Sequence, residues 1–174
     1  MGARAANRAQ TVARIAIMVS LASVLHAVEA LIPVPYVVPG AKLGLANVVA
    51  LYAVATLGLR EALAISFLRT LLGSLITGTF LNTGYYIGTA GALASTLMMS
   101  LVWMLFHGHV SVVGVSVIGA VTHNLAQLLT AVLLLRTTGV LFYIPYLLLF
   151  AIPTGVFVGF VCKRVLASGR GSGT

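Results

Sequence analysis

Charged side chains are scarce in this sequence. They make up 7% of its 174 residues, whereas about one quarter of an average soluble domain is charged. Hydrophobic residues account for 60%, the mean hydropathy is +1.13, and no hydrophilic stretch is long enough to form a soluble domain. The composition therefore predicts an all-α integral membrane protein with a single domain.

Acidic side chains are nearly missing. The chain has no aspartate, and its two glutamates are Glu29 and Glu61, which the spans assigned below put on opposite sides of the membrane. Metal-assisted reactions of diphosphates need several carboxylates close together, and no GxxxxGK[ST] segment is present for ATP. No acidic residue is placed to orient His123 for nucleophilic catalysis. We therefore expect no catalytic residues, no cofactor and no enzyme activity of this chain alone.

Cysteine is limited to Cys162, so a disulfide within the chain and a zinc site of several cysteines are excluded. Cys162 fits a buried small residue, and palmitoylation beside Lys163 at the membrane edge is the alternative. His107 and His109 lie in a predicted turn without a nearby Cys, Asp or Glu. We expect no metal site there.

Basic side chains outnumber acidic ones, and the formal net charge is +8. Seven of them flank apolar stretches on one predicted side: Arg4, Arg8, Arg14, Arg60, Lys163, Arg164 and Arg170. Lys42 and Arg136 fall on the other side, so the excess marks the cytoplasmic side by the positive-inside rule. Aromatic and basic residues do not interleave as a nucleic-acid surface requires, and no nucleic-acid partner is expected.

Six apolar stretches are long enough to be membrane helices. They lie at about 15–32, 43–59, 61–81, 85–106, 114–135 and 146–162. We predict a cytoplasmic segment at 1–10, a six-helix transmembrane domain at 11–166 and a disordered cytoplasmic tail at 167–174, with both termini cytoplasmic. The basic leader before the first stretch also fits a signal peptide cleaved near Val28-Glu29-Ala30.

The stretch from Gly114 to Leu135 carries a polar cluster at its centre: Thr122, His123, Asn124 and Gln127. On a helix, His123 and Gln127 share a face, and Asn124 lies beside them. Polar side chains at that depth lose their water and need a partner in the bundle or a ligand. Three polar residues within five positions favour a ligand-binding role.

Other polar residues are predicted to converge with this cluster below the proline-rich external segment 33–42. Lys42, Asn47, Asn82 and Glu29 lie in the outer half, and Arg69 forms the floor. An arginine within a span costs about a few kcal/mol, so Arg69 is expected to face the interior or an aqueous cavity. Glu29 lies near the outer end of its span and Arg69 near the middle of another. Glu29 therefore matches Lys42 in depth better than it matches Arg69, and no direct Glu29–Arg69 pair is expected. The basic residues favour an anionic ligand, and interhelical hydrogen bonding is the alternative for each polar residue.

Small residues form a strip along the first predicted helix. They are Ala9, Ala13, Ala16, Ser20, Ser23, Ala27 and Ala30. Such strips let membrane helices approach closely, so this strip packs within the bundle or docks onto a partner membrane subunit. Gly84-x-x-x-Gly88-x-x-x-Ala92 and Gly155-x-x-x-Gly159 also predict close helix packing.

Three segments resemble a known family: PGAKLGLANVVALYA at 39–53, LRTLLGSLITGTF at 68–80 and SVIGAVTHNLAQLL at 116–129. They are similar to the bacterial membrane family called heptaprenyl diphosphate synthase component I, also known as Gx transporters. The resemblance covers about residues 11–165. The family is grouped with the substrate-binding S components of energy-coupling-factor (ECF) vitamin transporters.

The resemblance implies a six-helix bundle in the bacterial cytoplasmic membrane that captures a small metabolite from outside. S components dock on a transmembrane coupling protein and two ATPases through an Ala-x-x-x-Ala motif on the first helix, which Ala9 and Ala13 resemble. Ala16 and Ser20 extend this expected docking face. The alternative function is an accessory membrane subunit, beside a soluble synthase subunit, in isoprenoid or menaquinone side-chain synthesis.

Overall fold

The computed structural model describes residues 2–31, 44–106 and 108–171, and this part of the chain is all helical. The elements are α1 (Gly2–Leu31), α2 (Leu45–Thr56), α3 (Leu59–Ile76), α4 (Thr83–Leu105), α5 (Val112–Leu135), the 3-10 helix η1 (Gly139–Tyr143) and α6 (Ile144–Gly171). The all-α prediction is confirmed for these residues.

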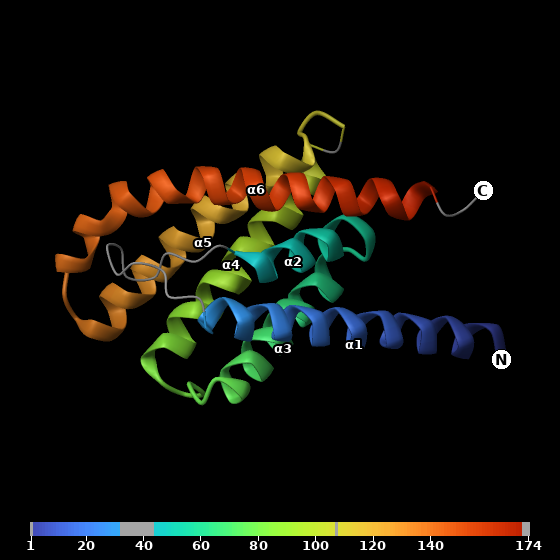
Figure 1. Ribbon diagram of the computed structural model, residues 1–174, viewed down its shortest axis with the longest axis horizontal. Coiled ribbons are helices and arrows are strands. Elements are labelled where there is room, and N and C mark those ends of the chain that lie inside the picture. Colours follow the sequence, from blue (N-terminus) through green and yellow to red (C-terminus); the bar gives the residue numbers. More distant parts are fainter. Residues whose placement is uncertain (1, 32–43, 107, 172–174) are drawn as a thin grey trace.

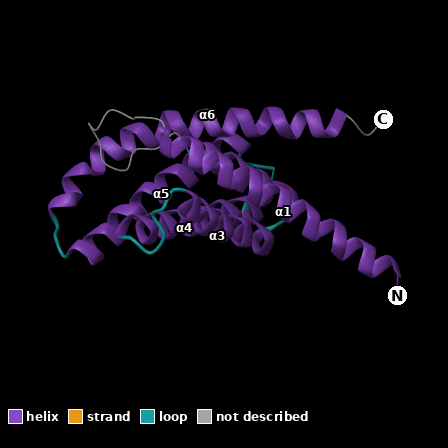
Figure 2. Cartoon of the chain, turned by 60° about the horizontal axis from the view of Figure 1, so that its bottom comes forward, coloured by secondary structure: helices purple, strands orange, loops and turns teal. Residues whose placement is uncertain are grey.

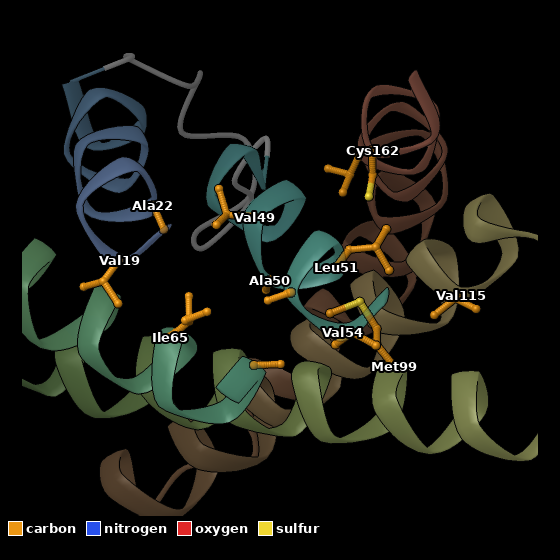
Figure 3. Packing of buried hydrophobic residues seen from close by; sticks show 13 residues of the cluster. Val19, Ala22, Val49, Ala50, Leu51, Val54, Ile65, Met99, Val115 and Cys162 are labelled. Carbon is orange, nitrogen blue, oxygen red and sulfur yellow. The ribbon is translucent and has the colours of Figure 1, made fainter. Parts of the chain in front are cut away.

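Helix α2 is the central element. It packs against α1, α3, α4 and α6, and its sequence LANVVALYAVAT is apolar nearly all round, which is typical of a helix surrounded by protein. Figure 3 shows Val49, Ala50, Leu51 and Val54 of α2 among side chains of the neighbouring helices. Leu51 and Ala50 are fully buried. The hydrophobic core therefore lies around α2.

Helices α1 and α6 are the longest, with 30 and 28 residues. Their terminal ends, at Gly2 and Gly171, lie at the same end of the molecule (Figures 1 and 2). Both helices extend beyond the predicted spans. α6 continues where the sequence predicted a disordered tail from residue 167, and the Ser168 hydroxyl donates a hydrogen bond to the Arg164 carbonyl within this extension.

Four helical segments are long and apolar enough to cross a membrane: Ala9–Glu29, Thr83–Leu105, Val112–Leu135 and Gly139–Gly169. Large apolar side chains on them face outward, among them Ile17, Met104, Leu133 and Phe160. α2 has 12 residues and, at about 1.5 Å per residue, is shorter than a hydrocarbon core of about 30 Å. α3 has 18 residues, but it carries the charged residues Arg60, Glu61 and Arg69 and is not one of these four segments.

Glycines bring α5 and α6 into close contact. A Cβ added at Gly155 would lie 2.7 Å from the Cα of Val117, and one at Gly159 would lie 2.6 Å from the Cα of Val113. The predicted Gly155-x-x-x-Gly159 packing is therefore confirmed. Small residues at this spacing allow the two backbones to approach.

The close-packing prediction for α4 agrees with the burial of Ala92, at 1% exposure, and is wrong for its two glycines. A Cβ at Gly88 would meet nothing within 4 Å, and one at Gly84 would meet only the side chain of Asn82. The glycine that contacts α5 is Gly91, where a Cβ would lie 2.7 Å from Cγ of Gln127. The reason is the rotation of α4, which turns Gly91 toward α5 and leaves Gly88 beside open space.

Candidate functional site

A small cavity lies inside the bundle and is lined by residues of all six α-helices. Its polar lining consists of His26 and Glu29 from α1, Asn47 from α2, Arg69 and Thr70 from α3, Ser116, His123, Asn124 and Gln127 from α5, and Thr154 from α6. The cavity volume is about 50 Å³. Pockets for drug-sized ligands enclose about 300–1,000 Å³, so this cavity matches a few heavy atoms.

Arg69 is the buried cation of this cavity, with 3% of its surface exposed. It belongs to the inner face of α3, where Ala62, Ile65 and Ser66 are also buried. One terminal nitrogen of its guanidinium donates a hydrogen bond of 2.7 Å to Oδ1 of Asn47. This bond joins α3 to the start of α2. Within the described part of the chain, the buried Nε has no hydrogen-bond acceptor.

Glu29 lies on the same cavity wall, and its carboxylate accepts a hydrogen bond from the backbone N–H of Gly44. Gly44 is the N-cap of α2 and has a positive φ of 73°, a conformation that glycine adopts without steric cost. Backbone N–H groups at a helix N-terminus carry partial positive charge. Glu29 therefore holds α1 against the start of α2.

The sequence placed Glu29 and Arg69 at different depths in the membrane, but both residues line this cavity. α1 also contributes His26, three residues before Glu29 and on the same helical face. A Cβ at Gly73 would lie 2.6 Å from the His26 ring, so the absence of a side chain there makes room for the imidazole. His26 was missed because it was read only as part of an apolar span, although its spacing from Glu29 was the available signal.

The predicted polar cluster of α5 contributes three residues to the wall: His123, Asn124 and Gln127. Asn124 Nδ2 donates a hydrogen bond of 2.9 Å to the Leu147 carbonyl of α6, so this amide also connects two helices. Gln127 is 7% exposed, and its side chain packs where Gly91 of α4 leaves space. Thus close contact between α4 and α5 positions the cluster.

Ser116 lies two turns before this cluster on α5 and was also missed by the sequence reasoning. Its side chain is 3% exposed, and its buried hydroxyl has no hydrogen-bond partner among the described residues. Thr122, by contrast, donates its hydroxyl hydrogen bond to the Ile118 carbonyl of its own helix and is not part of the cavity wall. Helical spacing from His123 was the available signal for Ser116.

Asn82, another predicted site residue, is not among the residues that line the cavity. Asn82 is exposed and caps α4, because its Oδ1 accepts a hydrogen bond of 2.8 Å from the Tyr85 backbone N–H. Its polarity serves the helix start rather than the cavity. Lys42 lies outside the described residues. Arg136, which the sequence analysis counted with the basic groups favouring an anion, is exposed at the end of α5.

The predicted docking strip on α1 is divided by the fold. Ala9, Ala13, Ala16 and Ser20 are exposed, whereas Ser23 is buried at 3% exposure. The strip therefore has an outer part available at the surface and an inner part that packs within the bundle.

These features define an all-helical, membrane-type bundle around a small polar cavity. The family model described as heptaprenyl diphosphate synthase component I matches residues 18–165. The chain belongs to this family, which confirms the resemblance drawn from the three sequence segments. Comparisons with curated proteins and with solved structures find no match.

Proposed function

We propose that this protein is the substrate-binding subunit of an uptake transporter of the ECF type or a related type. It binds a small metabolite from the outer side in the cavity around Arg69. The observation that carries the proposal is the set of polar side chains from α1, α2, α3, α5 and α6 on one small cavity. A ligand bound there would contact side chains from several helices, so its binding would stabilise the packing of these helices against one another.

The proposed setting is the bacterial cytoplasmic membrane, with six crossings and both termini in the cytoplasm. The terminal ends of α1 and α6 lie on one side of the molecule, as an even number of crossings requires. Arg14, Arg60, Lys163 and Arg164 favour the cytoplasmic assignment. α2 would cross as a short helix shielded from lipid by its neighbours, and α3 would present its exposed Phe67, Leu75 and Ile76 to lipid.

The proposed partner is a membrane coupling protein that works with two ATPases. The exposed small residues Ala9, Ala13, Ala16 and Ser20 support this proposal, because a helix with small side chains can pack closely on another membrane helix. The protein itself is proposed to catalyse no reaction. The energy for uptake would come from the partner.

Gly88→Ala tests the cavity. Gly88 lines the cavity, and its Cβ would meet nothing within 4 Å, so the methyl group occupies ligand space without a clash. Mass spectrometry of small molecules released from detergent-purified protein should find a stoichiometric metabolite in the wild type. Gly88→Ala should reduce its affinity about tenfold or more, the cost of overpacking a small site.

The matched control is Gly169→Ala, which makes the same change in α6 at an exposed position with nothing within 4 Å of the added Cβ. It should retain the metabolite. Equal retention by wild type, Gly88→Ala and Gly169→Ala would contradict binding in this cavity.

A second candidate function is an accessory membrane subunit of heptaprenyl diphosphate synthase. The family description favours it, and the lack of aspartate means that a soluble partner must supply the metal-binding carboxylates. Co-purification with such a synthase subunit, and loss of its long-chain product when this chain is removed, would support this function over uptake.

A further inference from the structure

Arg69 has unused hydrogen-bonding capacity inside the cavity. A guanidinium has five N–H donors. Asn47 takes one of them, and the Nε–H is buried without an acceptor in the described part of the chain. A buried donor without a partner is costly. The missing acceptor is therefore one that a ligand can supply.

The negative charge of Glu29 already has a favourable contact of its own. Its carboxylate is hydrogen-bonded to the N–H of Gly44, at the N-terminus of α2, where the helix dipole favours an anion. This arrangement offsets part of the charge of Glu29 within the protein. The same carboxylate also acts electrostatically on Arg69, so Arg69 attracts a ligand through its unused N–H donor and the part of its charge that Glu29 does not offset.

Ser116 adds a second donor on the α5 side. Its hydroxyl is buried and without a partner among the described residues, and Ser116 lines the same cavity as Arg69. Two buried donors, one from α3 and one from α5, therefore line one cavity, and a planar group with two acceptor oxygens offers one acceptor to each. Carboxylates have this geometry, and arginine binds them with two parallel hydrogen bonds.

We propose that the cavity binds the carboxylate group of a small monoanionic metabolite, with Arg69 as its main partner and Ser116 as a second donor. This inference rests on the proposed function. Because Glu29 already offsets part of the Arg69 charge, a phosphate dianion would bury two further negative charges without compensation, whereas a carboxylate adds only one. The volume of about 50 Å³ accommodates a compact carboxylate head.

The test uses the full chain in mild detergent and two probes of nearly equal shape, propionate and its neutral amide, propionamide. Thermal unfolding is followed at constant ionic strength as either probe is added up to millimolar concentrations. Propionate should raise Tm in a saturable manner and propionamide should not, because ligand binding to the folded state alone stabilises it.

Three variants locate the effect. Arg69→Gln should weaken propionate binding at least about tenfold, as expected for a charge-assisted pair. Ser116→Ala, which removes only the unpartnered hydroxyl, should fold normally and weaken binding about three- to tenfold. Arg136→Gln removes an exposed cation outside the cavity and should leave propionate binding unchanged. Ser116→Ala keeps the test decisive if Arg69→Gln does not fold.

The outcomes separate this inference from the proposed function. Equal stabilisation by both probes, with loss of both effects in Gly88→Ala, would overturn carboxylate binding and retain the cavity as a binding site. A propionate effect that survives in both Arg69→Gln and Ser116→Ala would also overturn it. Selective propionate binding that depends on Arg69 and Ser116 would support the carboxylate site. If cells that lack the protein show no loss of uptake, the transport function would be rejected while the carboxylate site stands.

Discussion

The contact between α5 and α6 gives a quantitative prediction because the chain supplies two glycines with opposite surroundings. Gly155→Ala places a methyl group 2.7 Å from the backbone Cα of Val117, where no side chain can rotate away. Gly88→Ala places the same group in open space. Both changes gain about 1 kcal/mol of helix propensity, which cancels when the two variants are compared. The remaining difference is the overpacking cost of about 1–3 kcal/mol.

Thermal unfolding of the two variants in the same detergent, followed by circular dichroism, measures this difference. For a chain of this size, 1 kcal/mol corresponds to about 2–4 °C in Tm, so Gly155→Ala should melt about 2–12 °C below Gly88→Ala. Gly159→Ala, which meets the Cα of Val113 at 2.6 Å, should behave like Gly155→Ala. Equal Tm values for Gly155→Ala and Gly88→Ala would refute the close packing of α5 on α6.

Three further substitutions separate helix contacts from the cavity. Asn82→Ala should lower the free energy of unfolding by about 1 kcal/mol through loss of a helix cap and leave ligand affinity unchanged in a binding titration; reduced affinity would argue that Asn82 reaches the ligand. Glu29→Gln should lower stability by about 0.3–2 kcal/mol, because a neutral amide interacts less with the N-terminus of α2; an unchanged unfolding curve would contradict that contact. Asn124→Ala should cost about 1–3 kcal/mol, since the bond to the Leu147 carbonyl is lost, and a loss of ligand binding without a change in Tm would assign Asn124 to the ligand alone.

Only part of the cavity was predictable because a sequence shows which residues share a helix face, but not how neighbouring helices are rotated. The polar cluster of α5 has helical spacing, so the sequence predicted that its residues lie together: His123, Asn124 and Gln127. Asn82 has the same kind of side chain, yet it serves as a helix cap. A polar residue next to a turn has a local backbone use that competes with ligand binding.

The sequence by itself determined the class of protein. Its scarcity of charge and long apolar stretches indicate a membrane helical bundle, and three segments indicate the family. It also determined that Arg69 faces inward, because an arginine within an apolar helix is too costly in lipid.

The tertiary structure alone decided which groups meet. The rotation of α4 makes Gly91 rather than Gly88 the contact with α5, and the packing of α2 brings Asn47 to Arg69. The positive φ of Gly44 presents its N–H to Glu29. These contacts depend on the depth and rotation of separate helices, which are set by side-chain packing over the whole bundle rather than by the pattern within any one helix.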